Sequence, residues 1–373
     1  MRCLWQNSLM ALGSLMAAGV EAQTYSSCNP LNSNSCPADT ALGMTINVDF
    51  TNGAVNSFSA SGSPTYDKTN GVSFTVSKGG DAPQIQSLFY IMFGRVEVTM
   101  KAAPGAGIVS SLVLESDVLD EIDIEWLGSD ADEVQSNYFG KGQVTSYNRG
   151  QFHDLTGTQS KWITYTVDWT KDKIVWMADG TILRSMTEAQ AESGQYPQTP
   201  MRVKLGAWAG GDPNYNAAGT VKWARGPTDY TKGPFSMMVK KLVVTDYSTG
   251  KQYKYGDTTG DWESIQAVDG KVNGNINNKN AVTATATAVG SVSTGVGIPV
   301  GGIGTDKAAT STQSVWPWAT ATTGAIPSGW YMNSEGKILR ENTGSGSSVK
   351  PPALLCLLLT PALGALLLVM RLL

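Results

Sequence analysis

Residues 119–127 alternate acidic and apolar side chains along one short segment. A period of two is typical of a β-strand, on which residues two apart share a face. Glu121, Asp123 and Glu125 therefore point to one side, while Ile122, Ile124 and Trp126 point to the other. The apolar side predicts a buried face, so the acidic side should lie on the outer face of a sheet that covers a core.

Three carboxylates in a row repel each other, so stability gives no reason for them and chemistry must supply one. Glu121 and Glu125 are four residues apart, which separates their Cα atoms by about 13 Å on an extended strand. Side chains that lean together bring the carboxyl groups to roughly 5–5.5 Å, the separation of a retaining glycosidase. One glutamate then acts as nucleophile and the other as general acid and base. Asp123 between them is placed to hydrogen-bond the nucleophile and to push the two glutamate pKa values apart.

Two other interpretations of the acidic trio are a solvated edge strand and a calcium or magnesium site. The apolar opposite face argues against an exposed edge strand. No Asn- or Gly-rich ligand loop accompanies the acids, which argues against a cation site. The single histidine, His153, and the lack of further cysteine ligands argue against zinc. We therefore predict a catalytic site that uses no metal and no cofactor.

Many short alternating segments separated by turns predict an all-β fold. Charged residues are only 16% of the chain, which has 41 glycines and 11 tryptophans, a composition that favours a β-rich extracellular protein. Residues 188–192 form the one clear helical pattern. We expect a two-sheet antiparallel β-sandwich. The segments with strand-like patterns are 44–50, 72–77, 89–100, 108–114, 134–139, 163–169, 173–177, 181–184, 201–208 and 237–246.

Both ends of the chain carry processing signals. Arg2 followed by an apolar run predicts a secretory signal peptide over residues 1–22. An apolar tail that follows small residues and a polar spacer predicts a GPI-attachment signal over 343–373, with Asn342 as attachment site and Gly344 as its alternative. A C-terminal transmembrane helix is the competing interpretation. Residues 271–342 are rich in Ser, Thr, Ala and Gly and predict a stalk, which leaves 23–270 for the folded domain of a secreted, GPI-anchored protein at the cell membrane or wall.

The cysteine count and the net charge limit the remaining options. Cys3 and Cys356 fall in the two processing signals, so Cys28 and Cys36 predict a disulfide in the mature protein. A net charge of −4 without a Lys/Arg-rich run gives no sign of nucleic-acid binding. We expect the protein to act as a monomer.

Aromatic side chains near the acidic strand are candidates for sugar binding, because the apolar faces of pyranose rings pack on flat side chains. Tyr138 lies in the glycine-containing stretch that follows the acidic strand and is the first candidate. Lys204 and Trp208 share a strand face, so Trp208 is predicted to stack on a sugar and Lys204 to hydrogen-bond its hydroxyls. Any single aromatic residue has a core position as its alternative, and we assign three to the core outright, namely Trp126, Trp169 and Trp176.

The motif Glu121-Ile122-Asp123-Ile124-Glu125 matches the E-x-D-x-E signature of glycoside hydrolase family 16. The surrounding stretches resemble the fungal Crh-type cell-wall transglycosylases of that family, over about residues 28–265. The stretches that carry this resemblance are 94–98, 103–111, 120–128, 137–142, 208–213 and 232–235.

The resemblance implies a concanavalin A-like β-jelly roll with a catalytic cleft on its concave sheet, GPI attachment, and transfer of chitin onto β-glucan or chitin acceptors in the fungal wall. It places the nucleophile on Glu121, the assisting acid on Asp123 and the acid/base on Glu125. Its chitin-binding pattern resembles Lys204, Trp208 and Thr220. A plain β-glucan or chitin hydrolase is the first alternative, and a non-catalytic lectin is the second.

Overall fold

The computed structural model describes residues 26–143, 148–278, 281–286, 288–289, 330–332 and 338–340. The predicted signal peptide over 1–22, the predicted GPI signal over 343–373 and Asn342 lie outside these residues. None of the helices among the described residues is long and apolar enough to cross a membrane.

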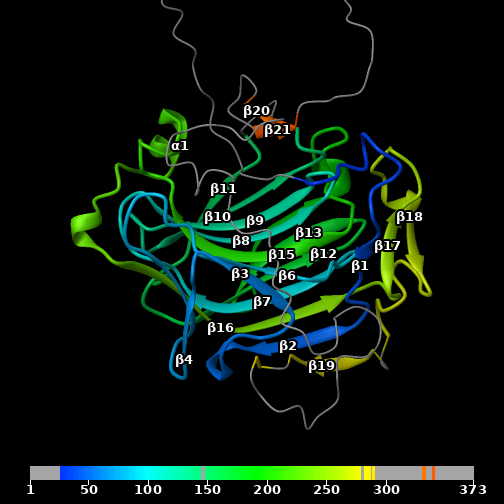
Figure 1. Cartoon of the computed structure of the whole chain (residues 1–373), viewed down its shortest axis with the longest axis horizontal. Coiled ribbons are helices and arrows are strands. Elements are labelled where there is room, and N and C mark those ends of the chain that lie inside the picture. The colour runs from blue at the N-terminus through cyan, green and yellow to red at the C-terminus, as the bar shows by residue number, and fades with distance from the viewer. Residues whose placement is uncertain are drawn as a thin grey trace, which may run out of the picture. The chain divides into compact units, whose positions relative to one another are not determined.

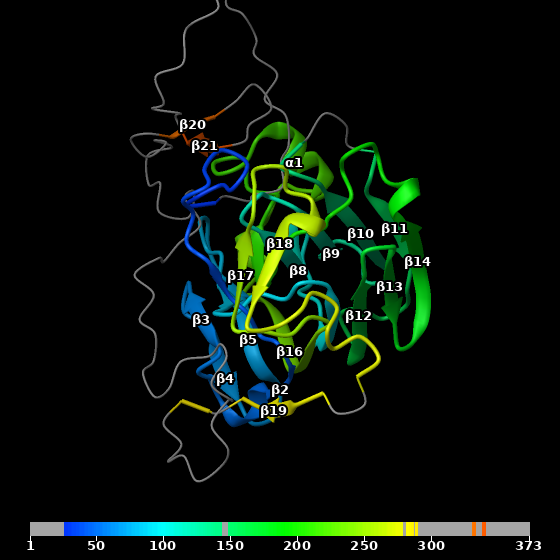
Figure 2. The same ribbon diagram turned by 90° about the vertical axis from the view of Figure 1, so that its right-hand side faces the viewer.

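Two large sheets make up the described domain (Figures 1 and 2). Their ladders are antiparallel except that β19 pairs with β2 in parallel. The seven-stranded sheet has the order β11 (Gln151–Asp154), β10 (Glu133–Phe139), β9 (Glu121–Leu127), β8 (Ile108–Ser116), β15 (Met201–Ala209), β6 (Gln84–Ser87) and β3 (Phe58–Ser61). The nine-stranded sheet has the order β14 (Thr181–Thr187), β13 (Lys173–Ala178), β12 (Ile163–Trp169), β7 (Gly94–Lys101), β16 (Phe235–Asp246), β2 (Thr45–Asp49) and β19 (Thr283–Thr285), with β5 (Gly71–Val76) on β16 and β4 (Thr65–Asp67) on β5.

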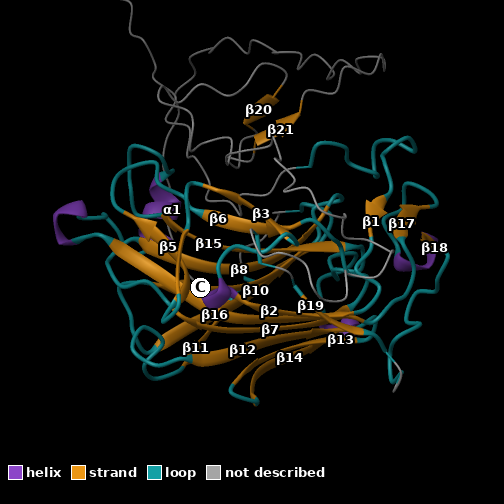
Figure 3. Ribbon diagram, turned by 60° about the horizontal axis from the view of Figure 1, so that its bottom comes forward, coloured by secondary structure: helices purple, strands orange, loops and turns teal. Residues whose placement is uncertain are grey.

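Smaller elements complete the described part of the chain, and Figure 3 shows how little of it is helical. A three-stranded sheet has the order β1 (Asp39–Thr40), β17 (Gln252–Tyr255) and β18 (Ile265–Val268), while β20 (Trp330–Met332) pairs with β21 (Ile338–Arg340). The helical elements are α1 (Ala218–Trp223) and the 3₁₀ turns η1 (Phe50–Asn52), η2 (Glu188–Gln190), η3 (Tyr230–Lys232) and η4 (Trp262–Ser264).

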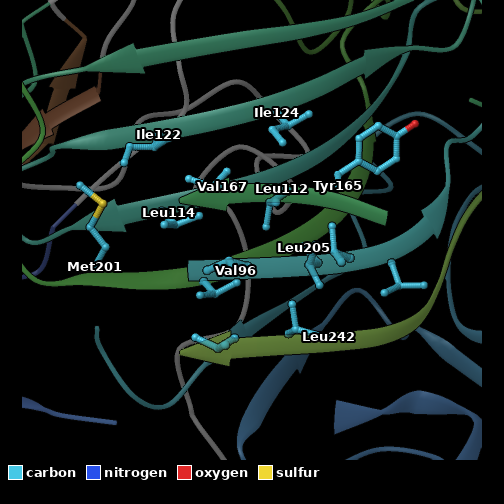
Figure 4. Packing of buried hydrophobic residues seen from close by; sticks show 14 of the residues in the cluster. Val96, Leu112, Leu114, Ile122, Ile124, Tyr165, Val167, Met201, Leu205 and Leu242 are labelled. Atoms are coloured by element: carbon cyan, nitrogen blue, oxygen red, sulfur yellow. The ribbon is translucent and has the colours of Figure 1, made fainter. Parts of the chain in front are cut away.

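One hydrophobic core lies between the two large sheets (Figure 4). Ile122 and Ile124 of β9 belong to it from one side, and Val96 and Leu242 from the other. The two-sheet antiparallel sandwich predicted from the alternating segments is therefore confirmed. The three tryptophans assigned to the core are fully buried, namely Trp126, Trp169 and Trp176.

Several predicted boundaries were wrong, each for a local reason. The strand expected over 89–100 begins only at Gly94, because Phe93 has a φ of 58° and turns the chain. The helix α1 was missed because Gly219, Thr220 and Val221 have weak helix propensity. The segment expected to begin the stalk contributes β19, whose Ala284 is 7% exposed, so the ordered domain extends beyond residue 270.

The predicted disulfide between Cys28 and Cys36 is present, with their Cα atoms 5.6 Å apart. It closes a loop of the chain just before β1.

Candidate active site

A tight turn joins β8 to β9 and sets the position of the first acidic residue. Leu119 has a φ of 66°, in the left-handed region, and its backbone N–H donates to the Ser116 carbonyl at 3.0 Å. The Ser116 N–H donates to the Asp120 carbonyl at 2.9 Å, and the Asp120 N–H donates to Ser116 Oγ at 2.9 Å. This turn places Glu121 directly opposite Glu115 in the ladder.

The buried carboxylate of Asp120 anchors the turn to two distant loops. It accepts hydrogen bonds from the Lys141 N–H at 2.8 Å, the Gln198 N–H at 2.9 Å and the Thr199 hydroxyl at 2.7 Å. Burial raises the pKa of Asp120, and these three hydrogen bonds oppose that rise. The start of β9 is thereby fixed immediately before Glu121.

The acidic trio lies on the face of the seven-stranded sheet that points away from the core, which we call the catalytic face. The strands β8, β9 and β10 lie side by side (Figure 1), and their ladder partners define the rows of this face. Glu121 lies between Glu115 and Phe139, Asp123 between Val113 and Asn137, and Glu125 between Ser111 and Gln135. The sequence prediction that the three acids share one face is confirmed.

Burial and mutual repulsion set the protonation of the trio. Burial, then the charge of Glu121, then that of Glu125, raises the pKa of Asp123 well above its ordinary value. A protonated Asp123 can donate the side-chain hydrogen bond that it shares with Glu121. Burial and the charge of Glu121 raise the pKa of Glu125 to about 8, a shift that Ser111 partly offsets. Asp123 and Glu125 therefore hold their protons more tightly than exposed carboxyl groups do.

A buried ion pair lies next to the trio, and sequence reasoning missed its acidic member. Lys204 of β15 lies on the catalytic face, in the row of Asp123, and its ammonium group contacts the carboxylate of Glu115. The Lys204 side chain is 8% exposed and that of Glu115 is 1% exposed. Burial lowers the pKa of Lys204 to about 7, whereas the carboxylate contact favours its charged form. Glu115 escaped detection because it lies near the end of a mostly apolar strand, and only the ladder brings it beside Glu121.

Two stacked indoles border the same face beyond Glu125. Trp208 of β15 and Trp223 of α1 lie with ring centroids 6.2 Å apart and an interplanar angle of 27°. The Trp223 indole N–H donates to Gln135 Oε1 at 3.1 Å, so this residue connects β15 to β10. Trp208 is half-buried and lies where sequence analysis expected a sugar platform, while Thr220 is buried in α1. The substrate-binding roles of Lys204, Trp208 and Thr220 stay predictions.

Comparison with known proteins gives the family. The family model of "Glycosyl hydrolases family 16" matches residues 48–225. The Crh-like protein 4 of Botryotinia fuckeliana is 56% identical over 337 residues, which cover 88% of this chain and 89% of that protein. The chain belongs to the Crh-like group of glycosyl hydrolase family 16. Crh-like protein 4 of Aspergillus fumigatus is 47% identical and is covered over 77% of its length, against 92% of this chain.

A solved structure described as Crh5 transglycosylase in complex with NAG is also similar to this Crh-like chain. It superposes with a TM-score of 0.62 and is 46% identical, covering 64% of this chain and 99% of its own. The Crh-like chain is thus an enzyme of the transglycosylase type with the sandwich fold of its family.

The structure of this Crh-like enzyme corrects one predicted sugar contact. Tyr138 is 3% exposed and belongs to the hydrophobic core. Its ladder partner on β9 is Ile122, which faces the core, whereas its neighbours Asn137 and Phe139 pair with Asp123 and Glu121. Because side chains alternate along a strand, Tyr138 cannot be the platform on the catalytic face.

The raised pKa of Glu125 predicts an alkaline limit to activity. The first step needs a protonated Glu125, so kcat/KM should fall about tenfold per pH unit above pH ~8. With a donor whose leaving group needs no proton, wild type should lose this limit, and Glu125→Gln should keep its activity and show no limit near pH 8. An alkaline limit near pH 8 that wild type keeps with such a donor contradicts the assignment.

The folded state also binds the Glu125 proton more tightly than the unfolded state does, so the stability contributed by Glu125 is largest at low pH and falls as pH rises from about 4.5 to about 8. Glu125→Gln should also raise the melting temperature at pH ~9 relative to wild type.

Proposed function

We propose that this Crh-like enzyme cleaves chitin and transfers the released chain to a β-glucan or chitin acceptor, with retention of configuration. The observation that carries the proposal is the placement of the trio: Glu121 and Glu125 lie on one face of β9, and Asp123 between them shares a hydrogen bond with Glu121. Burial and the charge of Glu121 raise the pKa of Glu125 to about 8, as a proton donor needs. A nucleophile and a proton donor on one strand face are what the first step of a retaining mechanism needs. A relative that binds NAG, the repeating unit of chitin, supports the choice of donor.

In the first step Glu121 attacks the anomeric carbon of the donor sugar. The bond from that carbon to the glycosidic oxygen breaks, and Glu125 gives its proton to the departing oxygen. Asp123 donates a hydrogen bond to Glu121 and so orients its carboxylate. The product is a glycosyl ester on Glu121, together with a shortened chain that leaves.

In the second step an acceptor hydroxyl replaces water. Its oxygen attacks the same anomeric carbon, the ester bond to Glu121 breaks, and the Glu125 carboxylate takes the hydroxyl proton. Two inversions at one carbon retain the configuration. Lys204 and Trp208, both on β15, serve the donor chain, and Lys204 is held in place by Glu115.

The proposed place of action is outside the cell. A signal peptide over 1–22, a stalk within 271–342 and GPI attachment at Asn342 would hold the enzyme at the membrane or within the fungal wall. The resemblance to Crh-type enzymes and the disulfide between Cys28 and Cys36 support this location.

Product analysis tests the proposed activity. The enzyme is incubated with chito-oligosaccharide donor and fluorescently labelled β-1,3-glucan acceptor, and the labelled products are analysed by mass spectrometry. We expect labelled chains lengthened by N-acetylglucosamine units. If only shortened donor chains form, whatever the acceptor concentration, the enzyme is a hydrolase and the proposal is wrong.

A further inference from the structure

An exposed phenyl ring lies on the catalytic face at the edge of the seven-stranded sheet. Phe152 of β11 pairs with Gln135 of β10, which pairs with Glu125 of β9. Two strand spacings separate Phe152 from Glu125, about 10 Å. Phe152 is 42% exposed, so part of its ring is accessible to a ligand on this face.

Arg225 fixes the orientation of this ring. Its guanidinium group lies 5.4 Å from the centroid of Phe152 and forms ion pairs with Asp130, at 3.2 Å, and with Glu133. Arg225 has a φ of 57°, a left-handed conformation that costs energy in a non-glycine residue and persists because its surroundings fix it. The Phe152 ring is therefore held in a defined place on the catalytic face.

The charges around Phe152 indicate the chemistry of a ligand. The single positive charge of Arg225 is matched by two carboxylates, so the surface offers no excess positive charge to an anionic ligand. A flat apolar ring with polar neighbours suits the faces of a neutral sugar.

The place of Phe152 relative to the catalytic residues indicates which sugar it meets. Lys204 and Trp208 lie on β15, two strands from β9 on one side, and Phe152 lies two strands from β9 on the other side. Phe152 also shares its row with Glu125, the residue that protonates the leaving chain, and not with Glu121. Gln135 and Trp223 join the two sides through their hydrogen bond.

We propose that Phe152, held by Arg225, is the platform on which the acceptor glycan stacks during the second step. The occupant is a neutral β-linked glucan or chitin chain whose hydroxyl attacks the glycosyl ester on Glu121 while Glu125 takes the proton. This inference rests on the proposed function, because it assigns the donor chain to the side of Lys204 and Trp208. A stacked sugar at this site favours transfer over hydrolysis by raising the local concentration of acceptor hydroxyls.

The substitution Phe152→Ala separates acceptor binding from the first step. With an activated chito-oligosaccharide donor and no acceptor, release of the leaving group should stay within about twofold of wild type, because the donor side is untouched. The acceptor concentration that gives half-maximal transfer should rise about tenfold, and the ratio of transfer to hydrolysis should fall. Phe152→Tyr keeps the ring, so the half-maximal acceptor concentration and the ratio of transfer to hydrolysis should both stay near their wild-type values. Ile182→Ala, which trims a side chain that is 62% exposed on the other large sheet, is the control and should change neither.

The outcomes distinguish this inference from the proposed function. If wild-type enzyme forms no lengthened products, the proposed transfer is wrong. If wild type transfers and Phe152→Ala shows the same acceptor dependence, only the acceptor platform is wrong. Equal losses in leaving-group release and transfer, with an unchanged melting temperature, would place Phe152 on the donor side and also overturn the inference. If Phe152→Ala does not fold, Phe152→Leu decides, because it keeps the apolar bulk and removes the flat ring. A higher acceptor concentration for half-maximal transfer then supports the platform, and the wild-type value overturns it.

Discussion

Replacing Glu121 by glutamine should lower the rate of chitin transfer by about four to six orders of magnitude, the range that loss of a covalent nucleophile produces. The amide has nearly the shape of the carboxylate but cannot form the glycosyl ester. Transfer of labelled chito-oligosaccharide, followed over hours at high enzyme concentration, measures the loss. A variant that keeps more than about one hundredth of the wild-type rate contradicts the nucleophile assignment.

The same substitution should stabilise the fold, which separates a catalytic role from a structural one. The charge of Glu121 raises the pKa values of both Asp123 and Glu125, so its removal relieves repulsion among three closely placed acids. The melting temperature at neutral pH should therefore rise. Glu97→Gln is the matched control, since it makes the same change on a partly exposed ion pair with Arg95 on the other large sheet and should leave activity unchanged.

The face of each acidic residue could be predicted from sequence because it depends on local alternation alone. Glu121, Asp123 and Glu125 are separated by core residues, and any sheet that buries Ile122 and Ile124 must place the acids on the other side. Lys204 and Trp208 were placed on one face by the same argument, and the ladder between β15 and β8 confirms it.

Contacts that depend on the register between strands could not be predicted in this way. Tyr138 was assigned to the sugar-binding face because it follows the acidic strand closely, but a shift of one residue in register reverses the face of every side chain on a strand. The observed pairing of Tyr138 with Ile122 settles the question. Glu115 and Phe152 escaped notice for the same reason, since the ladder alone brings them into the rows of Glu121 and Glu125.

Replacing Asp246 by alanine should destabilise the protein by about 3–5 kcal/mol, the largest effect on folding that we expect from one polar side chain. Asp246 is fully buried at the end of β16 and accepts four hydrogen bonds. The donors are the backbone N–H groups of Gly43 at 2.9 Å, Met92 at 3.1 Å and Ser248 at 3.0 Å, and the hydroxyl of Tyr253 at 2.5 Å. They come from four separate parts of the chain, so alanine leaves four donors without this acceptor where one large sheet meets the three-stranded sheet.

Urea denaturation of matched variants measures this loss. Asp257→Ala is the control, because Asp257 accepts bonds from the N–H and hydroxyl of Thr259 in an exposed turn, where water can replace the carboxylate. Its loss should be much smaller than that of Asp246→Ala. Tyr253→Phe removes only one of the four donors and should cost about 1–3 kcal/mol, and combining it with Asp246→Ala should cost less than the sum of the single effects, because both changes break the same hydrogen bond. If Asp246→Ala and Asp257→Ala unfold at the same urea concentration, the buried carboxylate does not hold the two sheets together.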